Sequence, residues 1–302
     1  MRSRYKLIFF IIAIGVCYQE YMSYEDSKTY LPEGTFVDMS GTQIYTEIVG
    51  QGDVTIVFDA GMMDTSYVWK SVVDEVSKFA QTFVYDRAGL GFSDKSPNPR
   101  DSTQVVEELH AILEKREISG PIILVGHSYG GLNMQLYAKT YPEYIVGLVL
   151  VDSAHPNQAN VLAKENALFS FVKKASMWAA PIGVPRLYLS FNKSREKALK
   201  STTKHQYTSL KESTNFEASA RHVKNVVKTL GDLPIVVIAK NHSSGVTMGS
   251  TKQIREWAKL QESFLLLSEN ARIVFSENRQ HNIHQAQPEL VTEAINQLVE
   301  AL

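Results

Sequence analysis

Cysteine is nearly absent from this 302-residue chain, which contains only Cys17. One cysteine excludes an internal disulfide and a zinc site built from several cysteines. An excess of charge is also missing, because 31 basic side chains stand against 32 acidic ones and the net charge is −1. Nucleic-acid binding usually depends on a basic domain, so the composition predicts no nucleic-acid partner. The fold must therefore be held by the packing of its own core.

Long hydrophobic runs are rare, and the clearest one lies near the N-terminus. Arg2, Arg4 and Lys6 precede an apolar run at residues 7–18. This length is short for a membrane span but matches the apolar region of an export signal. No Ala-x-Ala cleavage site follows, and Cys17 lacks the small preceding residue expected beside a lipidated cysteine. The run therefore predicts export or membrane association without fixing which.

Four interpretations of residues 1–20 stay open: an uncleaved membrane anchor, a cleaved signal, a lipoprotein signal, or a helix packed against the domain. The first three place the folded domain outside the cytoplasm, either secreted or anchored to a membrane through residues 7–18. We predict this extracytoplasmic location. Residues 21–34 are polar and are expected to form a tether.

The rest of the chain alternates short apolar runs with amphipathic stretches. Runs at 54–58, 122–125 and 146–151 are apolar at successive positions, as in strands that are buried on both faces of a parallel sheet. Residues 36–49 predict a hairpin with a turn at Ser40-Gly41. Strands that alternate with helices indicate an α/β protein whose mostly parallel sheet is flanked by helices.

Residues 155–230 interrupt this alternation with a segment that is helical in tendency and rich in lysine and serine. A plain loop of this length is uncommon, so we predict a helical lid between the first part of the core, 35–154, and the second part, 231–302. The lid has 13 basic and 4 acidic side chains, a net charge of +9. This charge is typical either of a solvated outer face or of a lid near an anionic membrane or substrate.

The strongest local motif is Gly126-His127-Ser128-Tyr129-Gly130, which follows an apolar strand and precedes a helix. A turn this tight leaves little room for side chains two residues before and after the serine, and glycine occupies both positions. The turn exposes the hydroxyl of Ser128 above the carboxyl end of the sheet. The amides at the start of the following helix point to the same place and favour negative charge. The motif predicts a nucleophilic serine.

With this motif the chain resembles the α/β-hydrolase fold superfamily. The resemblance extends from about Leu31 to the C-terminus, and its matching segments are residues 58–62, 85–93, 126–130, 147–156 and a late histidine before 287–290. It implies the fold predicted above with an inserted helical lid. It also implies a catalytic triad in the chain order serine, acid, histidine.

The resemblance assigns the base to His281, which follows a last predicted strand at residues 271–275, and leaves His284 as a packing or supporting residue. The acid usually follows the penultimate strand, but no Asp or Glu occurs between Ile238 and Glu256. Some members carry the acid one strand earlier, and this implies Asp152. The acid holds the imidazole in its working tautomer and stabilises its charged form. The alternative for Asp152 is a capping role at the start of the lid.

The oxyanion hole implied by the resemblance consists of the backbone amides of Met62 and Tyr129. Asp86 and Arg87 resemble a structural pair behind the site. Dehalogenases and epoxide hydrolases of this fold use an aspartate where Ser128 stands, so we expect a serine hydrolase for a carboxylic ester, of the carboxylesterase or lipase type. The expected partner is a small, apolar acyl substrate, and no cofactor or metal is expected.

Two other functions stay open. The missing carboxylate after Ile238 favours a binding or signalling module with slow or no turnover. An aminopeptidase of the proline iminopeptidase type needs an acidic lid residue for the substrate amine, and the lid acids are Glu165, Glu196, Glu212 and Glu217. Apolar lid residues are expected to line an acyl pocket or to form the core of the lid: Phe169, Phe171, Met177, Trp178, Leu187, Tyr188 and Phe191. The sequence leaves the oligomeric state open.

Overall fold

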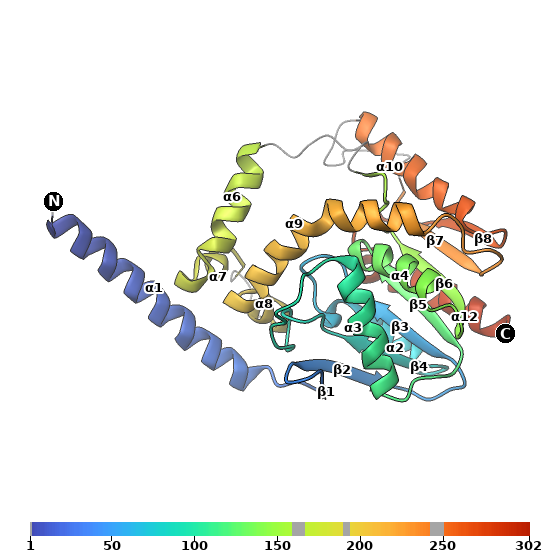
Figure 1. The fold of residues 1–302 in the computed structure, drawn as a ribbon, viewed down its shortest axis with the longest axis horizontal. Helices are drawn as coiled ribbons and strands as arrows, with labels where there is room; N and C mark the ends of the chain where they lie inside the picture. The colour runs from blue at the N-terminus through green and yellow to red at the C-terminus, as the bar shows by residue number, and fades with distance from the viewer. Residues whose placement is uncertain (1, 159–166, 190–193, 242–250) are drawn as a thin grey trace.

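A twisted eight-stranded sheet forms the centre of the computed structural model, which describes residues 2–158, 167–189, 194–241 and 251–302 (Figure 1). The strand order is β1-β2-β4-β3-β5-β6-β7-β8. The first two pairings, β1 with β2 and β2 with β4, are antiparallel, and the rest are parallel. The strands are β1 Thr35–Asp38, β2 Gln43–Val49, β3 Thr55–Asp59, β4 Gln81–Tyr85, β5 Ile122–His127, β6 Ile145–Val151, β7 Ile235–Ala239 and β8 Ala271–Phe275.

Helices cover both faces of the sheet because its central strands direct apolar side chains to both faces. On one face, Val57, Leu124 and Leu148 are fully buried beneath helices α3, α4 and α9. On the other face, Ile56 and Ile123 pack with helices α2 and α12. These helices are α2 Lys70–Val76, α3 Ser102–Lys115, α4 Tyr129–Thr140, α9 Thr203–Val226 and α12 Pro288–Glu300. Each buried aliphatic side chain contributes roughly 1.5–3 kcal/mol, so the two layers dominate the stability.

The remaining elements lie at the edges and ends of the sheet. They are α1 Arg2–Thr29, η1 Ser66–Trp69, α6 Ala167–Trp178, η2 Ala180–Ile182, α7 Val184–Leu189, α8 Arg195–Lys200, α10 Thr251–Ser263, η3 Phe264–Leu267 and α11 Ile283–Ala286.

The predicted fold class is confirmed, because a mostly parallel sheet lies between two helical layers. The expected hairpin is present as β1 and β2. Helix α3 begins at Ser102 because the carboxylate of Asp101 accepts a hydrogen bond from the amide of Gln104 at 3.1 Å. Such an N-cap stabilises a helix by about 1 kcal/mol.

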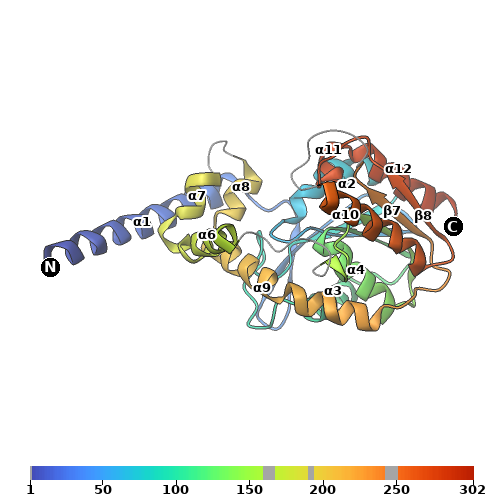
Figure 2. The ribbon, with the colours of Figure 1, turned by 90° about the horizontal axis from the view of Figure 1, so that it is seen from above.

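The N-terminal segment is one continuous helix, α1, and this differs from the expected tether. Residues 21–34 are helical up to Thr29. The polar second half of α1 packs on the lid segment, whereas its apolar first half projects beyond every other element (Figures 1 and 2). Helix Tyr5–Thr29 is long and apolar enough to cross a membrane.

The segment expected as a lid divides into two parts. Helix α9 lies on the sheet, since Ala220 and Val223 belong to the buried core between α9 and α4. Helices α6, α7 and α8 lie between α9 and α1, away from the sheet (Figure 1). Of the apolar residues in this part, Met177 is buried, whereas Phe171, Trp178 and Leu187 are exposed. The side chains of the other three residues named above, Phe169, Tyr188 and Phe191, lie outside the described residues.

Candidate active site

Ser128 stands at a sharp turn between β5 and α4. Its φ of +49° lies in a region that side chains other than glycine rarely adopt, which marks a strained backbone. A Cβ on Gly126 would lie 2.5 Å from the Cα of Gly131, and one on Gly130 would lie 2.2 Å from the carbonyl oxygen of Asp59. Any larger residue at these two positions would push the turn apart. The two glycines therefore permit the turn that lifts Ser128.

Asp152 and His281 form the closest polar contact of the site. The ring of His281 donates from Nδ1 to Oδ2 of Asp152 at 2.6 Å. Asp152 follows the last residue of β6 with a φ of +37° and is fully buried, whereas the side chain of His281 is 43% exposed. The loop after β8 thus brings the two predicted residues together across 129 positions of the sequence. The contact fixes the tautomer that leaves Nε2 free to accept a proton.

Asp152 also has two partners that the sequence analysis missed. The indole of Trp257 on α10 donates to Oδ1 at 2.8 Å, and the ammonium of Lys240 lies 3.2 Å from Oδ2. Burial raises the pKa of Asp152, but hydrogen bonding and charge from His281, with Lys240 and Trp257, outweigh it and lower the pKa to about 2. The carboxylate is therefore ionised over the whole range in which a histidine base operates.

Main-chain contacts bring Ser128 to the same place. Its amide donates to the carbonyl of Val151, the residue before Asp152, at 3.2 Å. The ring of His127 donates from Nε2 to the carbonyl of His281 at 3.1 Å. Within the described part of the chain, the hydroxyl of Ser128 and Nε2 of His281 make no hydrogen bond. Neither group is therefore engaged by another hydrogen-bond partner among the described residues.

The loop after β3, which carries Met62, is fixed from behind by Arg87. The guanidinium donates to the carbonyls of Ala60 and Gly61 at 2.7 and 2.8 Å. His205 of α9 donates to the carbonyl of Met63 at 2.9 Å. Among the described residues, the amides of Met62 and Tyr129 have no acceptor. Two free amides are therefore present, one on the clamped loop after β3 and one at the start of α4, directly after Ser128.

Arg87 is itself enclosed by two buried carboxylates. It contacts Asp59 at 2.6 Å and Glu212 of α9 at 2.7 Å, and all three side chains are at most 2% exposed. Burial lowers the pKa of Arg87, but the charges of Glu212 and Asp59 outweigh burial and raise it well above its ordinary value. Asp86 does not pair with Arg87 as expected, because its carboxylate accepts from Ser66 and Phe92. The predicted pair is wrong because each of the two side chains is occupied by other partners, Arg87 by Asp59 and Glu212.

Three further histidines near the site are buried and neutral. Burial lowers the pKa of His127 far below its ordinary value and that of His205 to about 3. Burial also lowers the pKa of His284 to about 3, and its ring packs 4.4 Å from those of Trp69 and His127. Neither ring nitrogen of His284 has a partner within the described residues. Its geometry is that of a packing residue.

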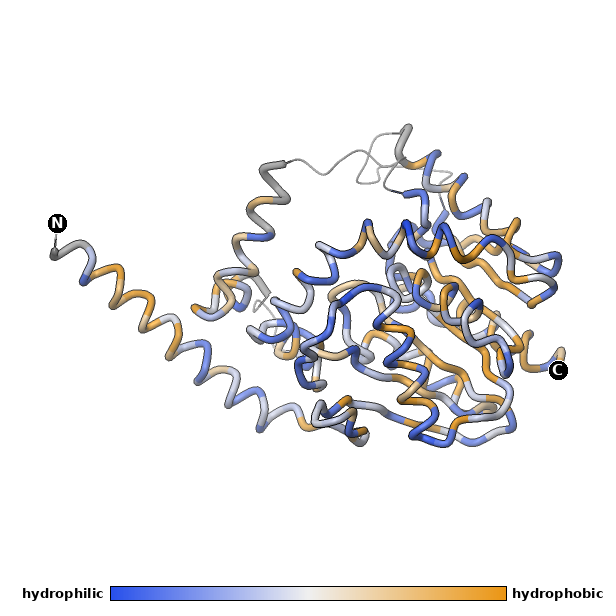
Figure 3. The backbone as a smooth tube through the Cα atoms, viewed as in Figure 1, coloured by the Kyte–Doolittle hydropathy of each residue, from blue (hydrophilic) through white to orange (hydrophobic). Residues whose placement is uncertain are grey.

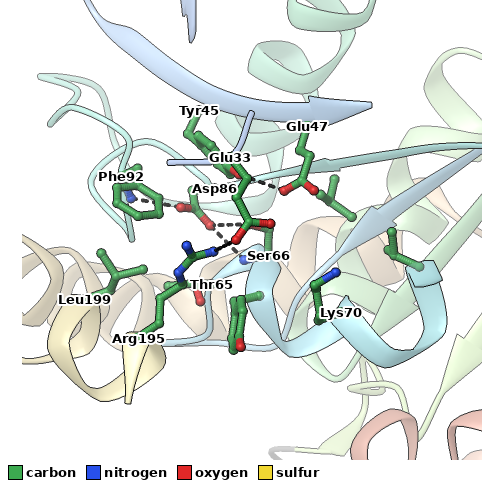
Figure 4. Close-up of a pocket in the computed structure, with 13 residues that line it drawn as sticks. Glu33, Tyr45, Glu47, Thr65, Ser66, Lys70, Asp86, Phe92, Arg195 and Leu199 are labelled. Atoms are coloured by element: carbon green, nitrogen blue, oxygen red, sulfur yellow. Dashed lines mark hydrogen bonds and ion pairs between the residues drawn. The ribbon is translucent and has the colours of Figure 1, made fainter. Parts of the chain in front are cut away.

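No group of three or more metal-binding side chains occurs among the residues that the structure describes. A separate crevice lies beside Asp86, between the edge of the sheet and α8 (Figure 4). The ion pair between Glu33 and Arg195 spans it at 2.6 Å. Its free volume of about 20 Å³ suits one water molecule, and neither Ser128 nor His281 lines it. This crevice is too small for an organic substrate.

Sequence similarity connects the chain to proteins of several kinds. The uncharacterized protein YqjL of Bacillus subtilis is 29% identical over 246 residues, which cover 82% of this chain and 83% of YqjL. The probable transporter efuK of Hormonema carpetanum is 28% identical over 198 residues, which cover 62% of this chain and 28% of that protein. The chain thus spans most of YqjL but under a third of efuK.

Solved structures share the fold at low sequence identity. Cfl2 of Burkholderia cenocepacia is 18% identical with a TM-score of 0.68, over 87% of this chain and 94% of Cfl2. An esterase of Exiguobacterium antarcticum is 14% identical with a TM-score of 0.66, over 88% of this chain and 99% of the esterase. The model of the family described as alpha/beta hydrolase fold matches residues 54–205, from β3 into α9. The chain belongs to the α/β-hydrolase fold family.

Proposed function

We propose that this protein is a serine hydrolase that cleaves a carboxylic ester through an acyl-enzyme on Ser128. The single observation that carries the proposal is the 2.6 Å contact between the buried Asp152 and the accessible imidazole of His281. A serine hydroxyl needs an adjacent base at neutral pH, and an oriented histidine is the usual one. The elbow glycines and the free amides of Met62 and Tyr129 support the same chemistry.

In the proposed reaction, Oγ of Ser128 attacks the ester carbonyl carbon and its proton passes to Nε2 of His281. The carbonyl oxygen becomes an oxyanion that accepts from the amides of Met62 and Tyr129. The intermediate collapses, the ester C–O bond breaks, and the departing alkoxide takes the proton from His281. Water then repeats the sequence on the acyl-enzyme and releases the acid.

An apolar acyl group suits the proposal best. The side chains that flank one of the amides, those of Met62 and Met63, are apolar and partly buried. A charged acyl group placed beside them would lose hydration without a partner. The alcohol part of the substrate has no comparable indication.

The aminopeptidase alternative is weakened by the partners of the lid glutamates. Glu212 is fully buried against Arg87, and Glu196 is paired with Lys200. Glu217 lies on the exposed surface of α9 near Arg221, and Glu165 lies outside the described residues. A substrate amine would have to displace an existing cation from two of these carboxylates.

We also propose that α1 is a membrane anchor with the hydrolase domain outside the cytoplasm. The 28-residue helix is about 42 Å long, more than the roughly 30 Å of bilayer hydrocarbon. Its apolar residues are exposed rather than used in the core. Basic residues at its N-terminal end favour a cytoplasmic N-terminus.

The proposed activity is tested with a series of p-nitrophenyl esters of increasing acyl length. We expect hydrolysis that falls by about 10⁴-fold or more in both Ser128→Ala and His281→Ala. Ser153→Ala serves as the matched control, because this buried serine bonds Gln135 and the carbonyl of Ala154 rather than substrate. Equal hydrolysis by wild type and Ser128→Ala would rule out the proposal. No hydrolysis of any ester by the folded wild-type protein would instead favour a binding module.

A further inference from the structure

A large apolar surface of the described chain is left uncovered. The first half of α1 exposes its large hydrophobic side chains, and Figure 3 shows this half as a hydrophobic stretch that continues into a hydrophilic second half. The exposed residues are Leu7, Ile8, Phe9, Phe10, Ile11, Ile12, Ile14 and Val16. Water is an unfavourable environment for so much contiguous apolar area.

A second apolar surface lies on the part of the lid segment beside α1. Phe171 in the first half of α6, Trp178 at its last position and Leu187 on α7 are 69%, 66% and 63% exposed. We call these three residues the lid patch. In Figure 1, α6 runs across the direction of α1 rather than along it, and its lower end lies near the middle of α1. A helix in this position lies along a bilayer surface when α1 crosses that bilayer.

A buried arginine holds the lid segment to α1. The guanidinium of Arg186 on α7 contacts Asp26 at 2.5 Å, Gln19 at 3.2 Å and Ser23 at 3.3 Å. Only 4% of the Arg186 side chain is exposed. The amide of Gln19 also donates to the carbonyl of Ser201 at 3.1 Å. Removal of one partner from such a buried charge is costly, so these contacts act as a clamp.

The clamp fixes the depth of the lid patch relative to the apolar half of α1. It begins at Gln19, directly after the apolar run ends at Tyr18. The adjoining groove of about 400 Å³ between α1 and the lid is lined by Tyr18 and Tyr21. Tyrosines prefer the boundary between acyl chains and headgroups. The clamp therefore lies at the level at which α1 is expected to pass from the acyl chains to the headgroups.

We propose that the lid patch is a second membrane contact, which rests at the headgroup level of an anionic bilayer while α1 crosses it. This inference rests on the proposed anchor. The occupant is a bilayer because the patch lies on the segment that Arg186 ties to the apolar helix, and because the part of the lid segment that carries it, residues 167–202, has seven basic side chains and one acidic one. Basic segments are attracted to anionic lipid by about 1 kcal/mol per charge near the surface. Aromatic side chains such as Trp178 anchor amphipathic helices at this boundary.

The inference is tested with the full chain in vesicles of phosphatidylcholine and phosphatidylglycerol, at a ratio of about 2:1. An environment-sensitive fluorophore is attached to Cys17, or in a Cys17→Ser background to Trp178→Cys or Leu187→Cys. Tyr144→Cys is the matched control, because Tyr144 is also an exposed aromatic residue but precedes β6, away from the lid. A quencher on the upper acyl chain reports the depth of each label.

We expect quenching at residues 17, 178 and 187 and none at 144. Quenching at 17 without quenching at 178 and 187 would overturn the inference and leave the anchor intact. No quenching at 17 would overturn the anchor and the inference together. Arg186→Met and the milder Asp26→Asn should each reduce quenching at 178 by about twofold or more, with quenching at 17 unchanged. Equal quenching at 178 in both variants would show that the clamp does not position the lid.

Discussion

Two buried carboxylates at the carboxyl edge of the sheet differ in whether the basic side chain beside them is accessible to a substrate. Asp59 is the last residue of β3 and Asp152 follows β6, and both are fully buried. The cation beside Asp59 is Arg87, which is sealed in by Glu212. The imidazole beside Asp152 belongs to His281, whose side chain is 43% exposed. Burial therefore does not distinguish the carboxylate that is proposed to act in catalysis. The two carboxylates differ in whether the group beside them is accessible to a substrate.

Among substitutions that test this comparison, the largest effect is expected at Asp152. Asp152→Asn keeps the shape of the side chain and the space around it, but it no longer attracts the charged imidazole or fixes its tautomer. We expect kcat for ester hydrolysis to fall by about 10³–10⁴-fold. Asp59→Asn is the matched control at the other strand end, and its kcat should change by less than about threefold. Equal losses in the two variants would contradict a special role for Asp152.

A substitution in the buried cluster of Arg87, Asp59 and Glu212 should instead lower the stability of the protein. Arg87→Met leaves Asp59 and Glu212 buried and close together without a cation. We expect the free energy of unfolding to fall by about 3–5 kcal/mol in a urea titration. The double variant in which Glu212→Gln is added should recover part of this loss, because one buried charge is removed. A change below about 1 kcal/mol in Arg87→Met would show that the cluster is hydrated.

Acid should destabilise the protein through its buried histidines. The pKa values of His205 and His284 fall from 6.5 to about 3 on folding. The unfolded chain therefore binds more protons between these pH values, and stability falls as the pH drops below 6.5. Each such histidine reduces the free energy of unfolding by about 2 kcal/mol between pH 7 and pH 5.

His284→Leu checks this assignment, since it removes one titrating group that has no hydrogen-bond partner within the described residues. The dependence of unfolding free energy on pH should become shallower by about one proton between pH 6.5 and 4. An unchanged slope would mean that His284 is protonated, or hydrated, in the folded protein.

The smallest effect is expected at Trp257. Trp257→Phe removes the donor to Oδ1 of Asp152 but keeps an aromatic ring beside Lys240 and His281. We expect kcat to fall by about tenfold, less than in Asp152→Asn, with KM little changed. A fall as large as that of Asp152→Asn would mean that Asp152 supports catalysis mainly through its hydrogen bond with the indole. Its contact with the imidazole would then matter less.

The sheet could be predicted from the sequence because the strands are short, apolar on both faces and separated by amphipathic helices. The same local reasoning predicted the elbow at Ser128. The absence of a carboxylate after Ile238 directed attention to Asp152, which the structure brings to His281. The catalytic roles of these residues stay predictions until activity is measured.

Contacts between distant segments were not predictable from the sequence. Glu212 meets Arg87 across 125 positions and Trp257 meets Asp152 across 105. Neither has a local motif, because each depends on where a long helix finally packs. Residues 21–34 were expected to be a tether because they are polar, but Asp26 and Ser23 bind Arg186.

The most direct test of the central claim is the rate at which a fluorophosphonate modifies the protein, with the adduct located by peptide mass spectrometry. If His281 activates Ser128, one adduct forms on Ser128 in the wild type, and the rate is at least about 100-fold lower in His281→Gln at an unchanged melting temperature. An adduct on another residue, or an equal rate in a folded His281→Gln, would contradict the account.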